Sequence, residues 1–187
     1  IQTAINMSSP LLPKYLVGLA SRDSLILEFA PTMLSLILAG KVGSSIASEL
    51  GSMRVSEQID ALEIMGVNSA SFLILPKIIA TIFFFPFLVI ISMGIGMVGA
   101  WIGGLSVDVT TADFLSGLKY DFNPFYVTYS LIKTVVFAFI IASVSSYFGY
   151  FTKGGSIAVG KSSTKAVVSS SILILVCNFI LTNLLLA

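Results

Sequence analysis

The sequence predicts an all-α transmembrane protein, a polytopic helical bundle, on three observations. Hydrophobic residues make up 56% of the 187 positions and charged residues 10%, whereas soluble domains have roughly 45–50% and about 25%. The mean hydropathy is +1.02. Four stretches are apolar over the roughly 20 residues that a helix needs to cross a bilayer, and no linker or low-complexity segment separates them. We therefore expect residues 1–187 to form a single membrane domain.

The expected spans lie at residues 25–47, 78–106, 126–152 and 166–187. The second is about thirty residues long, which predicts a tilted helix that runs past the interface. Asn123 and Pro124 precede the third span and predict its start. Residues 1–12 are moderately apolar and end among prolines, so we expect them to be the tail of a further span whose start is missing.

Positive charges in the connecting segments predict the orientation, because Lys and Arg accumulate on the cytoplasmic side of a membrane. Segments 48–77 and 153–165, with one lysine at the membrane edge, hold Lys41, Arg54, Lys77, Lys153, Lys161 and Lys165. The opposite side holds only Lys14, Arg22 and Lys119. We therefore expect both segments to lie in the cytoplasm.

The remaining composition excludes several classes of function. Lys and Arg number 10 and Asp and Glu number 9, so a net charge of +1 provides no basic surface for a nucleic acid. The chain has no histidine and one cysteine, Cys177, which excludes a Cys/His metal site, an internal disulfide and catalysis by an imidazole. We expect no catalytic residue and no metal ligand in this chain.

Residues 155–162 (GSIAVGKS) match the G-x-x-x-x-G-K-[ST] pattern of phosphate-binding loops. Such a loop leaves a buried strand and opens a helix in an α/β domain, whereas this one links two spans. No Asp or Glu follows residue 121 to hold Mg²⁺. We expect a flexible basic loop at the level of the lipid headgroups, and no nucleotide site.

Residues 52–67 are the long amphipathic segment outside the spans. Apolar side chains recur at three- and four-residue spacing, at Val55, Ile59, Leu62 and Met65, which predicts a helix. Ser52 or Ser56 would cap it, and Gly66-Val67-Asn68 would end it. A helix that lies on a bilayer usually presents Lys and Arg, but this one presents three acids, which anionic lipid repels. We therefore favour a cytoplasmic protein partner over an interfacial helix.

Two charged residues inside the spans mark a candidate site, because a charge within a membrane is costly and functional by default. Glu28 lies about a turn into the first span, and Lys133 enters the third span from the same outer side. Pro31 frees a backbone carbonyl near Glu28. We expect Glu28 to line a cavity. For Lys133, whose stem is longer, a cavity and snorkelling to the headgroups both stay open.

Several motifs together resemble the signature of the MlaE (YrbE) permeases, the membrane subunits of ABC systems that move phospholipids and related lipids between bacterial membranes. They are residues 39–67 (AGKVGSSIASELGSMRVSEQIDALEIMGV), 75–77 (LPK), 132–138 (IKTVVFA), 152–155 (TKGG), 159–160 (VG) and 164–168 (TKAVV). The resemblance therefore covers nearly the whole chain.

The resemblance implies a five-span permease in a bacterial inner membrane, preceded by an interfacial helix, with its first span largely missing here. It implies a homodimer that works with two cytoplasmic ABC ATPases, which bind ATP and magnesium, and with a periplasmic ring of MCE-domain proteins. A small STAS-type regulatory subunit is a further implied partner. The chain itself would hold no cofactor.

The resemblance also implies residue roles. The family's coupling helix, which contacts the ATPase, matches Arg54, Glu57, Gln58, Asp60 and Glu63. Glu28, Pro31 and Lys133 match positions beside a lipid cavity at the dimer centre, open toward the periplasm. Many relatives have Arg where this chain has Leu27, and Lys41 stands where Arg is usual. The first change removes a partner for a lipid headgroup.

We therefore expect the permease subunit of an ATP-driven phospholipid transporter, which acts between the inner and outer membranes. The alternative is an ATPase-independent secondary transporter or channel that uses Glu28 as a proton or ion site. A hydrolase built on Ser130 and Lys133 is disfavoured, because nothing supplies an oxyanion hole. Co-purified phospholipid would distinguish the first reading from the other two.

Overall fold

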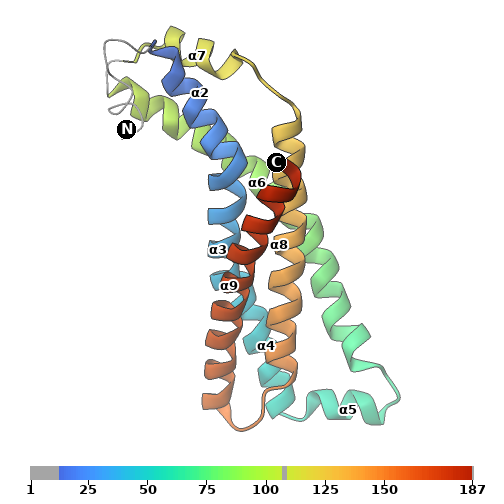
Figure 1. Cartoon of the computed structure of the whole chain (residues 1–187). Helices are drawn as coiled ribbons and strands as arrows, with labels where there is room; N and C mark the ends of the chain where they lie inside the picture. The colour runs from blue at the N-terminus through green and yellow to red at the C-terminus, as the bar shows by residue number, and fades with distance from the viewer. Residues whose placement is uncertain (1–12, 107–108, 187) are drawn as a thin grey trace. The chain divides into compact units, whose positions relative to one another are not determined.

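The computed structural model describes residues 13–106 and 109–186, and all regular structure in these ranges is helical (Figure 1). The elements are α2 (Tyr15–Ser24), η1 (Leu25–Met33), α3 (Leu34–Leu38), η2 (Ala39–Gly43), α4 (Ser44–Val55), α5 (Gln58–Ile64), α6 (Ser69–Leu105), α7 (Thr111–Lys119), α8 (Phe125–Tyr150) and α9 (Ser156–Leu186). The span tail expected at residues 1–12 lies outside the described residues. The all-α, polytopic class is confirmed.

Four helical segments of the described chain are long and apolar enough to cross a membrane. They are Tyr15–Val55, Ser69–Leu105, Phe125–Tyr150 and Ser156–Leu186. Each contains or closely matches one expected span, but three of them begin about nine or ten residues earlier than hydropathy alone indicates. Hydropathy locates the part of a helix that crosses the bilayer, and polar residues continue the same helix beyond it.

The start of α8 follows from local chemistry. The side-chain Oδ1 of Asn123 accepts a hydrogen bond from the backbone N–H of Phe125 at 3.0 Å, and Pro124 supplies a fixed φ for the first turn. Asn123 and Pro124 therefore begin the helix as the sequence predicts.

The expected basic loop at residues 155–162 is wrong. Ser156–Leu186 is one helix, so all but the first residue of the phosphate-loop pattern form the first turns of α9. No proline follows Ser156 to stop the helix. Backbone N–H groups beyond the first turn of a helix are bonded within it, which leaves no loop to cradle a phosphate.

The chain forms two compact units, residues 1–31 with 88–132 and residues 32–87 with 133–187. In the first unit, α2 packs on α7 at two glycines. A Cβ on Gly117 would lie 2.1 Å from the backbone oxygen of Tyr15, and one on Gly18 would lie 2.5 Å from that of Phe114. Any side chain at either position would therefore separate the two helices. Val17, Val109 and Phe114 form the apolar core beneath this contact.

Arg22 ties the first unit together. Its side chain is almost fully buried, and its Nη1 donates to the backbone oxygens of Leu118 at 2.9 Å and Tyr120 at 2.8 Å. Its Nε contacts Asp23 at 2.8 Å. From the sequence, Arg22 is only a charge on one side of the membrane, because the sequence does not reveal that two carbonyls lie beside it.

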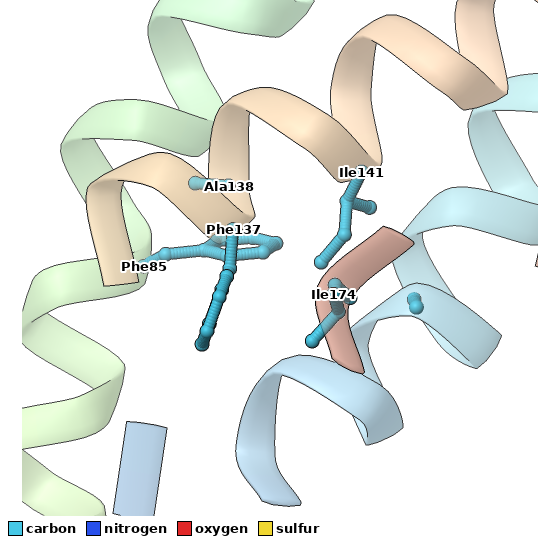
Figure 2. Close-up of a cluster of buried hydrophobic side chains, with 6 residues drawn as sticks. Phe85, Phe137, Ala138, Ile141 and Ile174 are labelled. Carbon is cyan, nitrogen blue, oxygen red and sulfur yellow. The ribbon is translucent and has the colours of Figure 1, made fainter. Parts of the chain in front are cut away.

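The second unit holds the larger core, formed by six buried side chains from four helical segments (Figure 2). They are Ala39, Phe85, Phe137, Ala138, Ile141 and Ile174. Around this core α4 packs along α9, and Ser163 donates to the backbone oxygen of Ser44 at 3.1 Å. A Cβ on Gly149 would lie 2.8 Å from the backbone oxygen of Ala47, so α8 also lies directly against α4.

The first long helix contains two π-helical segments, η1 and η2. Pro31 lies inside η1. A proline has no N–H to donate and its ring collides with the carbonyl four residues earlier, and a wider helical turn accommodates both effects without ending the helix. Pro31 therefore perturbs the backbone near Glu28, as expected, and the perturbation is a π-helical segment that contains both residues.

Candidate functional site

The segment that the sequence predicts as one helix over residues 52–67 is divided in two. Helix α4 continues to Val55, and Glu57 then adopts a left-handed conformation with φ of 60°. L-residues seldom adopt this conformation inside a helix, so it ends α4 and redirects the chain into α5. The expected serine cap is also wrong: Ser56 Oγ donates back to the carbonyl of Ser52 at 2.8 Å.

The expected end of the helix agrees with the structure. Helix α5 ends at Ile64, and Gly66 has a positive φ of 79°. The backbone N–H of Val67 reaches the carbonyl of Leu62 at 3.1 Å. A glycine adopts this left-handed conformation at little cost, which explains why the chain turns at this residue.

Three of the predicted coupling residues hold α5 in place. Asp60 accepts from Arg54 Nη1 at 2.5 Å, and the Arg54 guanidinium lies 5.7 Å from the ring centroid of Tyr150. Glu63 accepts from the hydroxyls of Tyr150 at 2.8 Å and Ser69 at 2.9 Å. In Figure 1, α5 lies at the lower end of the second unit, beside the end of α4. Its polar contacts therefore join α4, α6 and α8.

The same contacts change the ionisation of Glu63. Hydrogen bonds from Tyr150 and then from Ser69 lower the pKa of its carboxyl group, because they stabilise the charged form. Ile59 provides the apolar anchor and is fully buried. Helix α5 is thus held to the second unit by one buried side chain and by polar contacts that need a carboxylate.

The exposed side of α5 carries the other two predicted coupling residues and two large apolar side chains. Glu57 and Gln58 are exposed. Ile64 and Met65 are 87% and 68% exposed, although they lie outside the apolar spans. Met65 belongs to the apolar spacing that predicts the helix, and Ile64 falls outside that spacing. Two large apolar side chains exposed beside acids are typical of a surface that binds another protein.

Lys133 lies in a partly buried row of polar side chains. Its side chain is fully buried and its Nζ donates to Thr182 Oγ1 at 3.1 Å. Thr182 donates to the backbone oxygen of Asn178 at 2.8 Å, and the side chain of Asn178 contacts Thr32 at 3.3 Å. The snorkelling alternative for Lys133 is therefore wrong.

Glu28 and Pro31 belong to the first unit, and Lys133 belongs to the second. Glu28 is half-buried and Pro31 is buried, and both lie in η1. A π-helical turn shifts the register of the side chains around it and is frequent at functional positions. A cavity shared by Glu28 and Lys133 stays a prediction.

Comparison with known proteins decides the family. The family described as "Permease MlaE" matches residues 1–184. The chain belongs to the MlaE permease family. As a member of this family with four span-capable helices in its described residues, it is a multi-pass membrane protein. Its relatives include proteins named as probable ABC transporter permeases.

Curated relatives of this MlaE-family permease come from bacteria and a plant. A probable ABC transporter permease protein of Rickettsia bellii is 42% identical over 162 residues, which are 86% of this chain and 62% of the relative. One of Synechocystis is 36% identical over 163 residues, 87% of this chain and 62% of the relative. The protein TRIGALACTOSYLDIACYLGLYCEROL 1, chloroplastic, of Arabidopsis thaliana is 34% identical over 161 residues, 83% of this chain and 45% of the relative. The chain thus spans about three fifths, or less, of these relatives.

Proposed function

We propose that this MlaE-family chain is the membrane subunit of an ATP-driven phospholipid transporter in the inner membrane of a bacterium. In this proposal it works as a non-catalytic homodimer, and a separate cytoplasmic ATPase binds ATP and magnesium. A periplasmic MCE-domain ring and a STAS-type subunit are further proposed partners, which rest on the family resemblance alone.

The surface of α5 carries the proposal. Ile64 and Met65 are exposed outside the span-capable helices, and the acids beside them disfavour contact with anionic lipid. An apolar patch with an acidic rim suits a protein partner that has an apolar socket and basic residues around it. The polar contacts of Arg54, Asp60 and Glu63 hold α5 to three helices. A partner that moves α5 would therefore move the spans attached to it.

Two observations support a lipid as the substrate. The name of the Arabidopsis relative denotes a galactosylated diacylglycerol, which is a membrane lipid. Lys133 is a buried cation with polar neighbours on α9, and a phosphate group would repay the cost of keeping its charge inside a membrane protein. We assign headgroup contacts to Lys133 and Glu28, with Pro31 shaping the backbone beside Glu28.

Co-purification with the ATPase tests the proposal. Glu57→Lys combined with Ile64→Glu places charges on the exposed side of α5, so we expect the tagged permease to lose its ATPase in a pull-down. Lys119→Glu, a charge reversal at an exposed position of α7 in the other unit, is the control and should retain it. Full ATPase binding by the double variant would contradict the proposed coupling surface. Lipid transport by the permease without any ATPase would support the alternative secondary transporter.

A further inference from the structure

A basic cavity lies where α8 meets α9. Its volume is about 410 Å³, and its lining includes Lys153, Lys161 and Lys165 together with the aromatic rings of Tyr147 and Phe151. All five side chains are exposed at this end of the second unit. Three lysines thus line one hollow that is large enough for a phosphate ester.

No acid on these two helices neutralises the lysines, because residues 122–187 contain no Asp or Glu. Segment 32–87 has four acids: Asp60 pairs with Arg54, Glu57 is exposed beside α5, and the other two contact their own partners. Glu49 contacts Lys77 at 2.7 Å, and Glu63 accepts from Tyr150 and Ser69. The cavity therefore presents net positive charge and selects an anion.

An apolar groove of about 290 Å³ adjoins the basic cavity. Ile74 and Ile78 of α6 line it, together with Ser146 of α8, and it shares Tyr147 and Phe151 with the cavity. The two rings, 5.0 Å apart between centroids, form the boundary between the two hollows. A basic hollow joined to an apolar groove matches a molecule with an anionic head and a hydrocarbon tail.

Ser146 gives an independent indication of a ligand in the groove. Its hydroxyl is buried, and its Oγ has no hydrogen-bond partner among the described residues. A serine inside a helix commonly donates back to a carbonyl three or four residues earlier, as Ser170 does to Ala166 at 2.8 Å. The hydroxyl of Ser146 can instead donate to an ester carbonyl of a bound lipid.

We propose that this double hollow is a binding site for one anionic phospholipid of the adjacent membrane leaflet. The lysines hold the phosphate, the groove holds the start of an acyl chain, and Ser146 donates to the glycerol ester. Tyr147 and Phe151, each 60% exposed, lie at the end of a span, where aromatic side chains meet the headgroup layer. Basic pockets between such helices bind anionic headgroups. The inference stands whether or not the chain transports lipid, because it does not involve Glu28 or Lys133.

Fluorescence quenching in vesicles tests the site. The chain has one tryptophan, Trp101, so Trp101→Phe with Phe151→Trp places a single reporter at the boundary. In phosphatidylcholine vesicles with the same small fraction of brominated lipid, we expect brominated phosphatidylglycerol to quench the reporter more strongly than brominated phosphatidylcholine. Lys161→Gln should lower the preference for the anionic lipid about fivefold, as expected for one lysine near a membrane surface. Lys119→Gln, on α7, should leave it unchanged.

Two further measurements complete the test. Ser146→Ala should weaken quenching by both brominated lipids equally, because the glycerol ester is common to them. Native mass spectrometry of the chain without reporter substitutions should retain phosphatidylglycerol, and the Lys161→Gln variant should lose it. Equal quenching by both lipids, or a Lys161→Gln variant that behaves like Lys119→Gln, would overturn the proposal. Saturable displacement of the lipid by inorganic phosphate or ATP would assign the cavity to a soluble anion and overturn it as well.

Discussion

Lys133 is a fully buried cation with a hydroxyl partner on α9. Burying an ammonium group costs roughly several kcal/mol in lost hydration. The hydrogen bond from Lys133 to Thr182 offsets part of this cost. The sequence indicates Lys133 because charges are rare in apolar runs. It does not indicate Thr32, Asn178 or Thr182, because small polar residues are common in membrane helices and only the fold places these three in one row.

Lys133→Met tests whether the charge serves function or folding. Methionine fills a similar volume without the charge, so we expect thermal stability in detergent to be unchanged or raised. Lipid transport should fall at least tenfold in proteoliposomes, because the proposed phosphate contact is removed. Lys41→Met is the control, since Lys41 is exposed and should tolerate the change. Transport at the wild-type rate by Lys133→Met would remove Lys133 from the proposed site.

Arg22 stabilises the first unit through hydrogen bonds to two backbone carbonyls. Arg22→Met leaves the carbonyls of Leu118 and Tyr120 without their donor, which should lower the free energy of unfolding by about 3 kcal/mol. Lys119→Met, an exposed cation of the same unit, should change it by less than about 0.5 kcal/mol. Denaturant unfolding followed by circular dichroism measures both, and equal stabilities would show that Arg22 does not hold the unit together.

At the scale of elements, chain chemistry predicts some helix ends well and others poorly. Asn123 begins α8 and Gly66 follows the end of α5, both as expected. Capping and a positive φ depend on single residues, which the sequence shows directly. The break at Glu57 is not predictable in this way, since glutamate has no preference for the left-handed conformation. It is maintained by tertiary contacts of α5, which the sequence does not display.

The attachment of α5 should depend on pH through Glu63. Its lowered pKa means that the stabilisation by Tyr150 and Ser69 is complete above the ordinary pKa of a glutamate and is lost as pH falls through the lowered value. Hydrogen exchange of the α5 amides, corrected for intrinsic rates, should therefore show protection at neutral pH and a loss at strongly acidic pH. Glu63→Gln should abolish this step, whereas Asp60→Asn should retain it. A step that persists in Glu63→Gln would assign the titration to another group.

For the whole molecule, composition and hydropathy predict the fold class and the number of spans, because both depend on sums over many residues. The cytoplasmic location of segments 48–77 and 153–165 is not tested by contacts within the chain and stays a prediction. The two π-helical segments and the division into two units depend on packing between helices, which periodicity does not specify.

The orientation of segments 48–77 and 153–165 follows from the positive charges and remains a prediction. In a Cys177→Ser background, Asn68→Cys should react with a membrane-impermeant maleimide only in inverted vesicles. Lys119→Cys should react only in right-side-out vesicles. Both target positions are exposed. Labelling of Asn68→Cys from the outside would place α5 away from any cytoplasmic ATPase.

The central claim, that a separate ATPase drives lipid movement through α5, is tested most directly by ATP-dependent lipid transfer in proteoliposomes that hold the permease and its ATPase. Wild-type protein should transfer fluorescent phospholipid only when ATP is present. The Ile64→Glu variant, with its spans intact, should lose that transfer at least tenfold while the ATPase still hydrolyses ATP. Equal transfer by the variant, or transfer by the wild type without ATP, would contradict the account.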